Sequence, residues 1–238
     1  MAPSSAPTFV CDTCGQAVER VRRDVLDADY DALQKKPYWN CDSCYGKKHR
    51  KRVAANVAMK LGERHLFIIG FMATGKSKIG PILAEMLERP FIDTDEWITE
   101  AAGLTISEIF EQQGEDAFRR LENDAIARAA AESASVIALG GGAIKLESNW
   151  EIIRARGISL CVTASPQLLN DRIGRNDERP LLSGLSDDER LARITEMLSE
   201  RGPYYGRADV AVESTDEQTP EETTGQALEI IREALREK

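Results

Sequence analysis

The sequence predicts an α/β protein: a five-stranded parallel sheet with helices on both faces, preceded by a small metal-stabilised N-terminal module. Three observations lead to this expectation. From residue 65 onward, short apolar runs alternate with stretches of helical periodicity. Four of the five cysteines lie within the first 44 residues. Residues 1–60 carry 11 Lys and Arg against 7 Asp and Glu, whereas the remainder carries 20 against 33, so a basic region precedes an acidic one.

The composition is that of a globular protein. The chain has 238 residues, 42% hydrophobic and 30% charged, which suits one domain plus an appendage. No stretch approaches the roughly 20 apolar residues of a membrane span, which argues against a membrane protein. The N-terminus lacks the basic start and apolar run of a secretory signal, so we expect a cytoplasmic protein. The acidic main body argues against general nucleic-acid binding there.

We expect residues 1–50 to form a zinc-ribbon-like module. Two C-x2-C pairs, with 26 residues between them, place four thiolates where two short turns complete a tetrahedral site. Zinc is the expected metal and iron the alternative, and the metal supplies the folding energy that so short a segment lacks. A disulfide pair is disfavoured without a signal peptide. His49 is expected to be solvated. The expected ligands are Cys11, Cys14, Cys41 and Cys44.

A basic run over residues 47–52 follows the second pair. It is interpreted either as a contact for nucleic acid or a protein partner, or as the start of a solvated helical linker over 51–63. We favour the linker, because no aromatic residues are interleaved with the basic ones. The main domain then covers 64–238.

The main domain is expected to alternate strands and helices. Thr105 and Glu108 predict a capping box. The expected strands are 66–70, 90–93, 135–139, 158–163 and 209–213. The expected helices are 76–88, 95–102, 105–112, 114–132, 148–156, 165–174, 187–201 and 219–236. Parallel sheets bind ligands at the carboxyl ends of their strands, so the residues after each strand are the candidate site.

The first strand leads into a phosphate-binding loop. Residues 70–77, GFMATGKS, match G-x4-G-K-[ST] between a predicted strand and a predicted helix. The backbone N–H groups of such a loop surround phosphate oxygens, Lys76 reaches the outer phosphates, and the Ser77 hydroxyl ligates Mg²⁺. The motif therefore predicts nucleotide binding.

The residues after the next strands supply candidate groups for the acceptor. Of Asp93 and Asp95, one carboxylate is expected to hold magnesium and the other to orient or deprotonate an attacking hydroxyl. Gly140, Gly141 and Gly142 allow close backbone approach to a ligand. Three arginines provide charge. Arg119 and Arg201 are candidates to hold a small carboxylate, and Arg179, within a polar segment over 175–189, is a candidate to close over the nucleotide.

Together and in this order, the segments GFMATGKS, FIDTDEWI, GEDAFRRLE, LGGGA, ERPLLSG and ERGPYYGRAD resemble the shikimate kinase family over about residues 64–236. The resemblance implies a fold like that of P-loop nucleoside monophosphate kinases. It also implies a monomeric kinase domain that uses ATP to phosphorylate the 3-hydroxyl of shikimate, in aromatic amino acid biosynthesis.

The resemblance also implies roles for individual residues. Lys76 contacts the transferred phosphate, with Ser77 and Asp93 on the magnesium side. Asp95 binds the acceptor's hydroxyls and acts as base. The shikimate pocket is formed by Arg119, Arg201 and the backbone of Gly140, Gly141 and Gly142. The ATP site comprises Ala73, Thr74, Gly75, Lys76, Ser77, Lys78, Arg172, Arg179 and Gln218.

Three departures from the family pattern concern nucleotide affinity more than chemistry. Ala73 stands where the family usually has glycine, Lys78 replaces a common threonine, and Pro81 removes one helical N–H. Two alternative functions stay open. One is a ligand-sensing regulator whose metal-bound module binds DNA or protein, and the other is a related small-molecule kinase such as a gluconate kinase.

Residues outside the motifs are interpreted structurally. Cys161 is expected to be a buried strand residue and His65 an ordinary residue at a strand's edge. Packing is the expected role of Trp39, Trp97 and Trp150.

Overall fold

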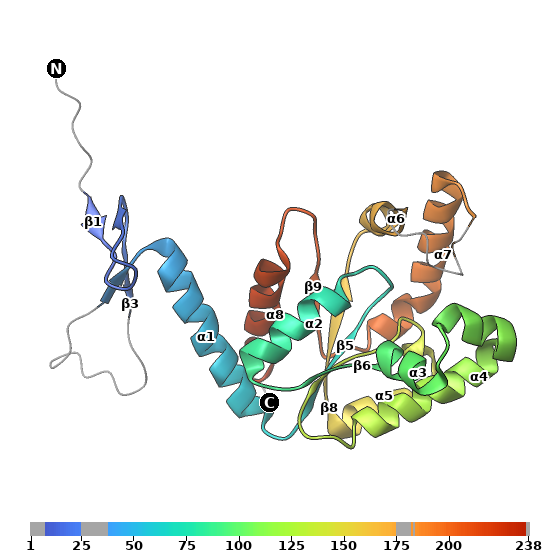
Figure 1. Ribbon diagram of the computed structural model, residues 1–238. Coiled ribbons are helices and arrows are strands. Elements are labelled where there is room, and N and C mark those ends of the chain that lie inside the picture. The colour runs from blue at the N-terminus through green and yellow to red at the C-terminus, as the bar shows by residue number, and fades with distance from the viewer. Residues whose placement is uncertain (1–7, 25–37, 175–181, 183, 237–238) are drawn as a thin grey trace. The chain divides into compact units, whose positions relative to one another are not determined.

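The computed structural model describes residues 8–24, 38–174, 182 and 184–236. The chain divides into two compact units, Met1–Val53, called the cysteine module below, and Ala54–Lys238, called the α/β unit (Figure 1). The boundary falls within helix α1 (Asp42–Leu61).

The α/β unit is built on a five-stranded sheet. Its strands are β5 (His65–Ile69), β6 (Phe91–Asp93), β7 (Val136–Ala138), β8 (Gly157–Thr163) and β9 (Val210–Glu213). Their order is β6-β7-β5-β8-β9, and every neighbouring pair is parallel, with Ile68 of the central strand opposite Ala138 and Leu160. All five predicted strands and their parallel arrangement are confirmed.

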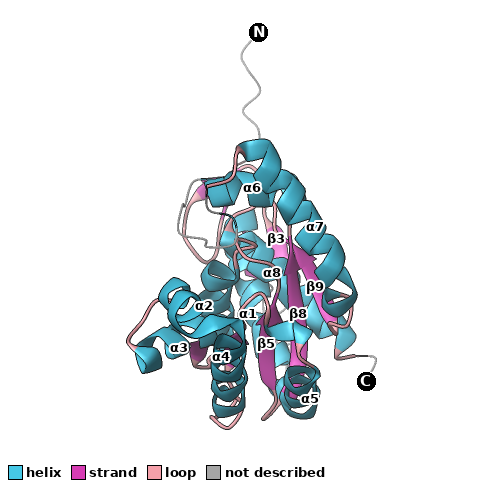
Figure 2. Cartoon of the chain, turned by 90° about the vertical axis from the view of Figure 1, so that its right-hand side faces the viewer, coloured by secondary structure: helices cyan, strands magenta, loops and turns pink. Residues whose placement is uncertain are grey.

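Helices connect the parallel strands and cover the sheet (Figure 2). They are α2 (Lys76–Leu87), α3 (Thr94–Ala102), α4 (Ile106–Ala129), α5 (Glu147–Arg156), α6 (Pro166–Gly174), α7 (Asp187–Tyr205) and α8 (Pro220–Ala234), with a short 3-10 helix η1 (Ala143–Lys145). The predicted capping box of Thr105 and Glu108 is confirmed. Within α4, Gly114 has φ 81° and ψ 172°, so the helix breaks between the two segments predicted for it.

Alternate residues of β5 pack on opposite faces of the sheet. Phe67 and Ile69 lie in one buried cluster with Ile126 of α4 and Trp150 of α5. Ile68, between them, points to the other face, on the side of α2 and α8, which pack against each other (Figure 1). Cys161 belongs to the same cluster as Trp150, which confirms that both are packing residues. His65 is also buried, and its Nδ1 accepts a hydrogen bond from Ser135 N.

The cysteine module contains two antiparallel hairpins followed by the first part of α1. Strands β1 (Phe9–Val10) and β2 (Ala17–Val18) form one hairpin, and β3 (Arg22–Asp24) and β4 (Tyr38–Asn40) form the other. Beneath the second hairpin, buried Asn40 donates to Asp24 Oδ2 at 2.9 Å. Trp39 was predicted to pack, and this is wrong: 44% of the residue is exposed, because nothing among the described residues covers the outer face of this two-stranded hairpin.

Helix α1 differs from the linker predicted over 51–63. It begins at Asp42, between the cysteines of the second pair, so that pair lies at a helix start and not in a second turn. The helical part of the prediction is confirmed, but the segment is solvated on one side only: Lys51 and Met59 are exposed, whereas the opposite side is buried. Val57 and Leu61 are buried in the α/β unit, and Lys60 Nζ donates to Leu235 O at 3.0 Å. Among the described residues, no helix combines the length and apolarity of a membrane span.

Candidate active site

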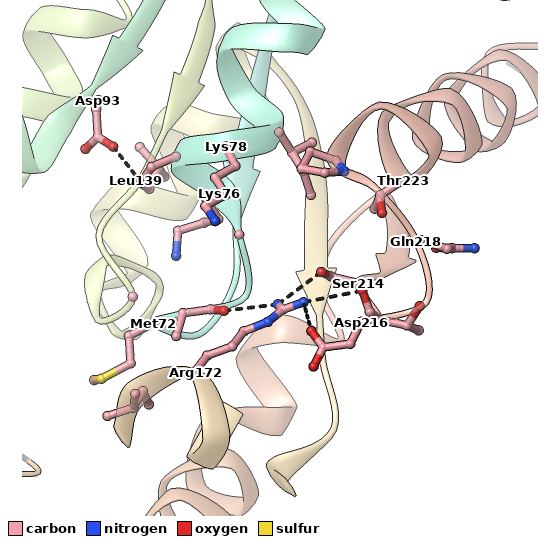
Figure 3. Close-up of a pocket in the computed structure, with 18 of the residues that line it drawn as sticks. Met72, Lys76, Lys78, Asp93, Leu139, Arg172, Ser214, Asp216, Gln218 and Thr223 are labelled. Atoms are coloured by element: carbon pink, nitrogen blue, oxygen red, sulfur yellow. Dashed lines mark hydrogen bonds and ion pairs between the residues drawn. The ribbon is translucent and has the colours of Figure 1, made fainter. Parts of the chain in front are cut away.

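The loop between β5 and α2 has the backbone of an anion cradle (Figure 3). Ala73 and Gly75 adopt left-handed conformations, with φ of 61° and 102°. Gly70 passes so close to β8 that a Cβ on it would lie 2.3 Å from Val162 O, which only glycine permits. The Lys76 ammonium donates to Gly70 O at 2.8 Å and to Phe71 O at 3.0 Å. The Lys76 ammonium therefore lies at the N-terminus of α2. The helix dipole also favours an anion there, so both features suit phosphate binding.

Thr74 in this loop and Pro81 in the following helix affect the backbone of this region. Thr74 is buried, and its hydroxyl donates to Phe71 O at 2.8 Å, which fixes the loop from inside. Pro81 lies within α2, which continues through it as one helix from Lys76 to Leu87.

A cavity of about 630 Å³ opens beside the loop. Its lining includes Lys76, Lys78, Arg172 and Gln218. Arg172 donates to Ala73 O at 3.3 Å and to Ser214 Oγ at 3.1 Å, so it joins the loop to the segment after β9. The buried Gln218 Oε1 has no hydrogen-bond partner among the described residues.

The carboxyl end of β6 brings two aspartates to this cavity. Asp93 caps α3 by accepting from Asp95 N at 3.0 Å, and its other oxygen lies 3.4 Å from Ser77 Oγ. A hydroxyl and a carboxylate oxygen at this separation are the hard donors that Mg²⁺ prefers, so the residues present fit that ion. Asp95, in the first turn of α3, also lines the cavity.

The three glycines after β7 each lie against a charged or polar group. A Cβ on Gly140 would meet Glu122 Oε1 at 2.6 Å and Asp95 Oδ1 at 2.7 Å, and one on Gly142 would meet the Arg119 guanidinium at 2.4 Å. The carbonyl of Gly141 accepts from Arg201 Nη1 at 3.2 Å and from Tyr205 Oη at 3.0 Å. These glycines let the base candidate and both arginines approach one turn of backbone.

Arg119 is held by two carboxylates. Its guanidinium lies 2.7 Å from Glu122 Oε2 and 3.0 Å from Glu115 Oε1. Burial alone would lower the pKa of Arg119, but the two carboxylates outweigh it and the pKa is raised. Burial raises the pKa of Glu122 to about 7, although Arg119 opposes that shift. Arg119 is therefore a partly buried hydrogen-bond donor, and the pKa of its partner Glu122 lies close to neutral pH.

Arg201 is the second cation of this pocket. It is 6% exposed, its Cζ lies 5.3 Å from the Phe71 ring centre, and its Nε has no hydrogen-bond partner among the described residues. A buried guanidinium with an unused donor is a ready site for a carboxylate. Arg179, the third predicted arginine, lies outside the described residues.

Comparison with known proteins identifies the family. The model of the shikimate kinase family matches residues 72–232. The chain is 40% identical over 153 residues to the shikimate kinase of Thermoanaerobacter pseudethanolicus, covering 64% of this chain and 88% of that protein. The chain belongs to the shikimate kinase family. The enzyme of Symbiobacterium thermophilum is 37% identical over 171 residues, which cover 71% of this chain and 97% of that protein.

Solved shikimate kinases share the fold. The Bacteroides thetaiotaomicron enzyme superposes with a TM-score of 0.67 at 30% identity, covering 74% of this chain and 99% of that one. The Acinetobacter baumannii enzyme, solved in complex with shikimate, also gives 0.67, at 31% identity, covering 76% and 98%. The match to the shikimate kinase model begins at residue 72, so the cysteine module lies outside it.

The structure adds groups that the sequence analysis of this kinase missed. Glu122 and Glu115 flank Arg119, and Tyr205 shares the Gly141 carbonyl with Arg201. A signal was available for the first two, because residues three and four apart in a helix are neighbours. Nothing in the local pattern marks Tyr205, since its partner is 64 residues away.

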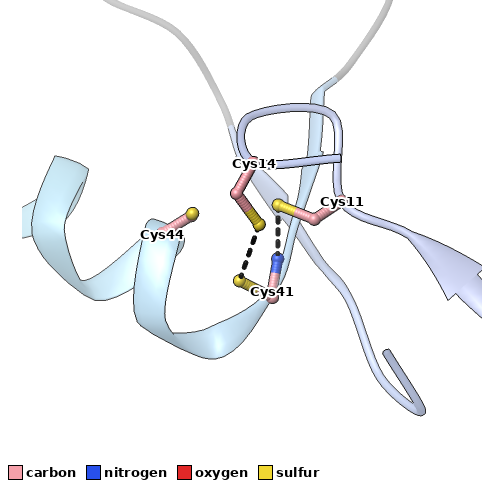
Figure 4. A group of neighbouring side chains, drawn as sticks. All are labelled: Cys11, Cys14, Cys41 and Cys44. Atoms are coloured by element: carbon pink, nitrogen blue, oxygen red, sulfur yellow. Dashed lines mark hydrogen bonds between the residues drawn. The ribbon is translucent and has the colours of Figure 1, made fainter. Parts of the chain in front are cut away.

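The cysteine module brings its four sulfurs together (Figure 4). The Sγ atoms of Cys11, Cys14, Cys41 and Cys44 all lie within 4.8 Å of one another, and Cys14 and Cys41 are separated by 4.0 Å. Tetrahedral zinc with Zn–S bonds of about 2.3 Å needs sulfurs about 3.8 Å apart, so the residues fit the ion. All four are free cysteines, and the cluster is compatible with a metal.

The protonation of the cluster is uneven. Hydrogen bonds from the backbone N–H groups of Cys14 and Cys41 lower the pKa of the Cys11 thiol to about 6. Hydrogen bonding to Cys41, followed by burial, raises the pKa of Cys44 to about 12. His49 stands apart from the sulfur group, half-buried and stacked on Tyr45 with ring centres 6.2 Å apart.

Proposed function

We propose that the chain is an ATP-dependent kinase that transfers the γ-phosphoryl group to the 3-hydroxyl of shikimate, giving ADP and shikimate 3-phosphate. The observation that supports this most is the triple glycine, which gathers Asp95, Arg119 and Arg201 around one turn beside the phosphate loop. An acid–base group and two carboxylate-binding cations beside an anion cradle suit phosphoryl transfer to a small hydroxy acid.

On the nucleotide side, the loop over 70–77 binds the phosphates through its backbone N–H groups. Lys76, now bonded to loop carbonyls, exchanges them for phosphate oxygens. Lys78 supplies a second cation in the cavity, in the place where the family pattern has a hydroxyl. Arg172 and Gln218 border the adenine end, and Gln218 Oε1 is available to accept from an exocyclic amine.

On the acceptor side, Arg119 and Arg201 bind the shikimate carboxylate and so fix the ring against the glycine backbone. Asp95 accepts the proton of the 3-hydroxyl while that oxygen bonds to the γ-phosphorus. The bond from the γ-phosphorus to the bridging oxygen breaks, and ADP carries away that electron pair. Arg179, predicted to cover the nucleotide, stays a prediction.

We assign magnesium to Ser77 and Asp93. The ion, when bound with ATP, neutralises phosphate charge as it does in other P-loop enzymes. Asp93 has a second function that is independent of the ion, because its capping bond to Asp95 N orients the first turn that carries the base.

A coupled ADP-release assay tests this function, with shikimate and gluconate as alternative acceptors. We expect turnover with shikimate only, and Asp95→Ala to reduce it at least about 100-fold while ATP still binds. Glu96→Gln, an exposed acid in the same helical turn, is the matched control and should keep full activity. No turnover with shikimate, together with normal ATP binding, would favour a ligand-sensing regulator instead.

For the cysteine module we propose structural zinc on the four sulfurs, with iron as the outcome that elemental analysis would reveal. The sulfur separations support a single tetrahedral ion. We also propose a cytoplasmic location, because a reducing compartment keeps the four cysteines out of disulfides and available to a metal.

A further inference from the structure

The side chain of Tyr205 ends at the same backbone carbonyl as that of Arg201. The Tyr205 hydroxyl donates to Gly141 O at 3.0 Å, and Arg201 Nη1 donates to the same oxygen at 3.2 Å. The two residues are four apart on α7, so they lie one turn from each other on the same face of that helix. Both side chains therefore reach the middle residue of the triple glycine from one helix.

The ring of Tyr205 is held by packing. It contacts two buried clusters of the α/β unit, one that contains Leu139 and Trp150 and another that contains Phe71 and Met197. An aromatic ring has few side-chain torsions, so packing against two clusters fixes its hydroxyl in one place. The hydroxyl therefore acts on Gly141 from a rigid support.

The hydroxyl of Tyr205 also keeps its proton. Burial raises the pKa of Tyr205 to about 12, although the charge of Arg201 opposes that shift. A phenol in this environment is a hydrogen-bond donor at neutral pH, so the bond to Gly141 O persists while the enzyme works.

Gly141 lies between the phosphate loop and the arginine. A Cβ on Gly141 would lie 3.4 Å from Met72 N and 3.7 Å from Arg201 Nη1. Arg201 uses one N–H group on the Gly141 carbonyl, and its buried Nε has no hydrogen-bond partner among the described residues. The bond to Gly141 O thus orients the guanidinium and leaves other donors for a carboxylate.

We infer that Tyr205 is a positioning residue for the acceptor: its hydroxyl fixes the Gly141 carbonyl, and that carbonyl orients the Arg201 guanidinium toward the substrate carboxylate. The inference rests on the proposed function, because the carboxylate is that of shikimate. Without the hydroxyl, the turn and the guanidinium gain freedom that carboxylate binding must then remove. The described lining of the cavity beside the phosphate loop does not include Tyr205, so we expect an effect on acceptor binding alone.

Steady-state kinetics of Tyr205→Phe, which keeps the ring and its packing, test the inference. We expect the KM for shikimate to rise about five- to tenfold, as for one lost hydrogen bond, with kcat and the KM for ATP within about twofold. Tyr204→Phe, the same change one residue earlier in α7, is the matched control. It should leave all three constants unchanged.

Two further measurements separate positioning from a general loosening of the fold. The carboxamide of shikimate lacks the charge that Arg201 binds, so the preference for shikimate over this analogue should shrink about fivefold in Tyr205→Phe. If Tyr205 acts through Arg201, then adding Tyr205→Phe to Arg201→Lys should raise the KM for shikimate by less than about twofold.

The outcomes that would overturn the inference are distinct from failure of the proposed function. An unchanged KM for shikimate in Tyr205→Phe, an equal rise of KM for both acceptors, or full additivity with Arg201→Lys would each overturn it, while turnover by the unchanged chain would still uphold the kinase. No turnover of shikimate by the unchanged chain would overturn both.

Discussion

The two units of this chain are stabilised by different means. In the α/β unit, a parallel sheet is buried between helices, and residues such as Phe67, Ile137 and Trp150 are at most 1% exposed. In the cysteine module, the buried residues described on the hairpins are two cysteines together with Asp24 and Asn40. One unit holds its site with apolar packing, whereas the other has almost no apolar interior of its own.

This difference explains why the functional side chains of the α/β unit lie in a packed pocket, whereas the cysteine module exposes aromatic side chains. The α/β unit orients Asp95, Arg119 and Arg201 within a packed frame, so its site is preorganised before substrate arrives. The cysteine module leaves rings on its surface, and the metal that we propose for its four sulfurs would take the place of an apolar interior as its source of stability. Perturbing either source of stability should therefore affect one unit and spare the other.

The largest effect is expected from removing the metal that we propose for the cysteine module. Chelation, or Cys11→Ser with Cys14→Ser, should unfold the module entirely, because structural zinc supplies roughly 10 kcal/mol or more in such modules. Hydrogen exchange should then be fast over 8–24 and 38–44 and still slow in β5 and β8. Shikimate kinase turnover should change less than about twofold. A parallel loss of turnover would show that the α/β unit depends on the module.

Adding one methyl group tests the packed frame of the other unit. Gly140→Ala would force a Cβ to within 2.7 Å of both Asp95 and Glu122, and the resulting shift should lower kcat/KM for shikimate about 100-fold. Gly202→Ala, where a Cβ meets nothing within 4 Å, is the control and should keep activity. Normal kinetics for Gly140→Ala would contradict the tight approach seen here.

The buried pair of Glu122 and Arg119 predicts a smaller, pH-dependent effect. Since burial raises the pKa of Glu122 to about 7, its carboxylate is protonated below neutral pH and its ion pair with Arg119 weakens. The KM for shikimate should rise several-fold as the pH falls through 7, with little change in KM for ATP. In Glu122→Gln the KM should already be raised and should no longer follow pH in this range. An unchanged profile in that variant would exclude Glu122 as the titrating group.

The same pKa has a consequence for stability, with the sign worked out from its direction. The folded state binds the Glu122 proton more tightly than the unfolded state, whose pKa is near 4.5, so this residue's contribution to the free energy of unfolding declines as the pH rises from about 4.5 to 7.

The smallest expected effect concerns the phosphate loop. Ala73 has φ of 61°, a left-handed conformation that costs a residue with a Cβ roughly 1 kcal/mol, so Ala73→Gly should raise the urea midpoint modestly. Glu88→Gly relieves the same strain at the C-terminal cap of α2, where φ is 55°. Both should stabilise the α/β unit, but only the first should alter KM for ATP. Equal nucleotide effects in the two variants would disprove a local role for Ala73.

The sequence predicted the α/β unit well because its signals are local. Strand length, helical period and the motif over 70–77 depend on neighbours along the chain, and the observed bounds agree within a few residues. The site was predicted for the same reason: parallel strands deliver their carboxyl ends to one edge, so Asp93, Asp95 and Gly140 meet there.

What escaped prediction depends on packing between distant segments. In the sequence, Glu122 is one of several acidic residues on a polar helix and would be expected to be exposed. Its carboxylate is buried because it packs against the turn at Gly140. Trp39 reads as a core residue because tryptophan is usually packed, but a two-stranded hairpin has an uncovered face. The start of α1 at Asp42 was hidden because a C-x2-C pair suits a turn and a helix start equally.

The anchoring of α1 determines how the catalytic part can be isolated. Arg89 donates to Gly62 O at 2.7 Å and to Ala58 O at 3.4 Å, and Val57 and Leu61 are buried in the same unit. A truncation that starts at residue 62 would strip two apolar side chains from the enzyme and leave Arg89 with fewer acceptors, and its failure would be mistaken for a need for zinc. Cutting near Ala54 keeps the whole anchor and gives the fair comparison.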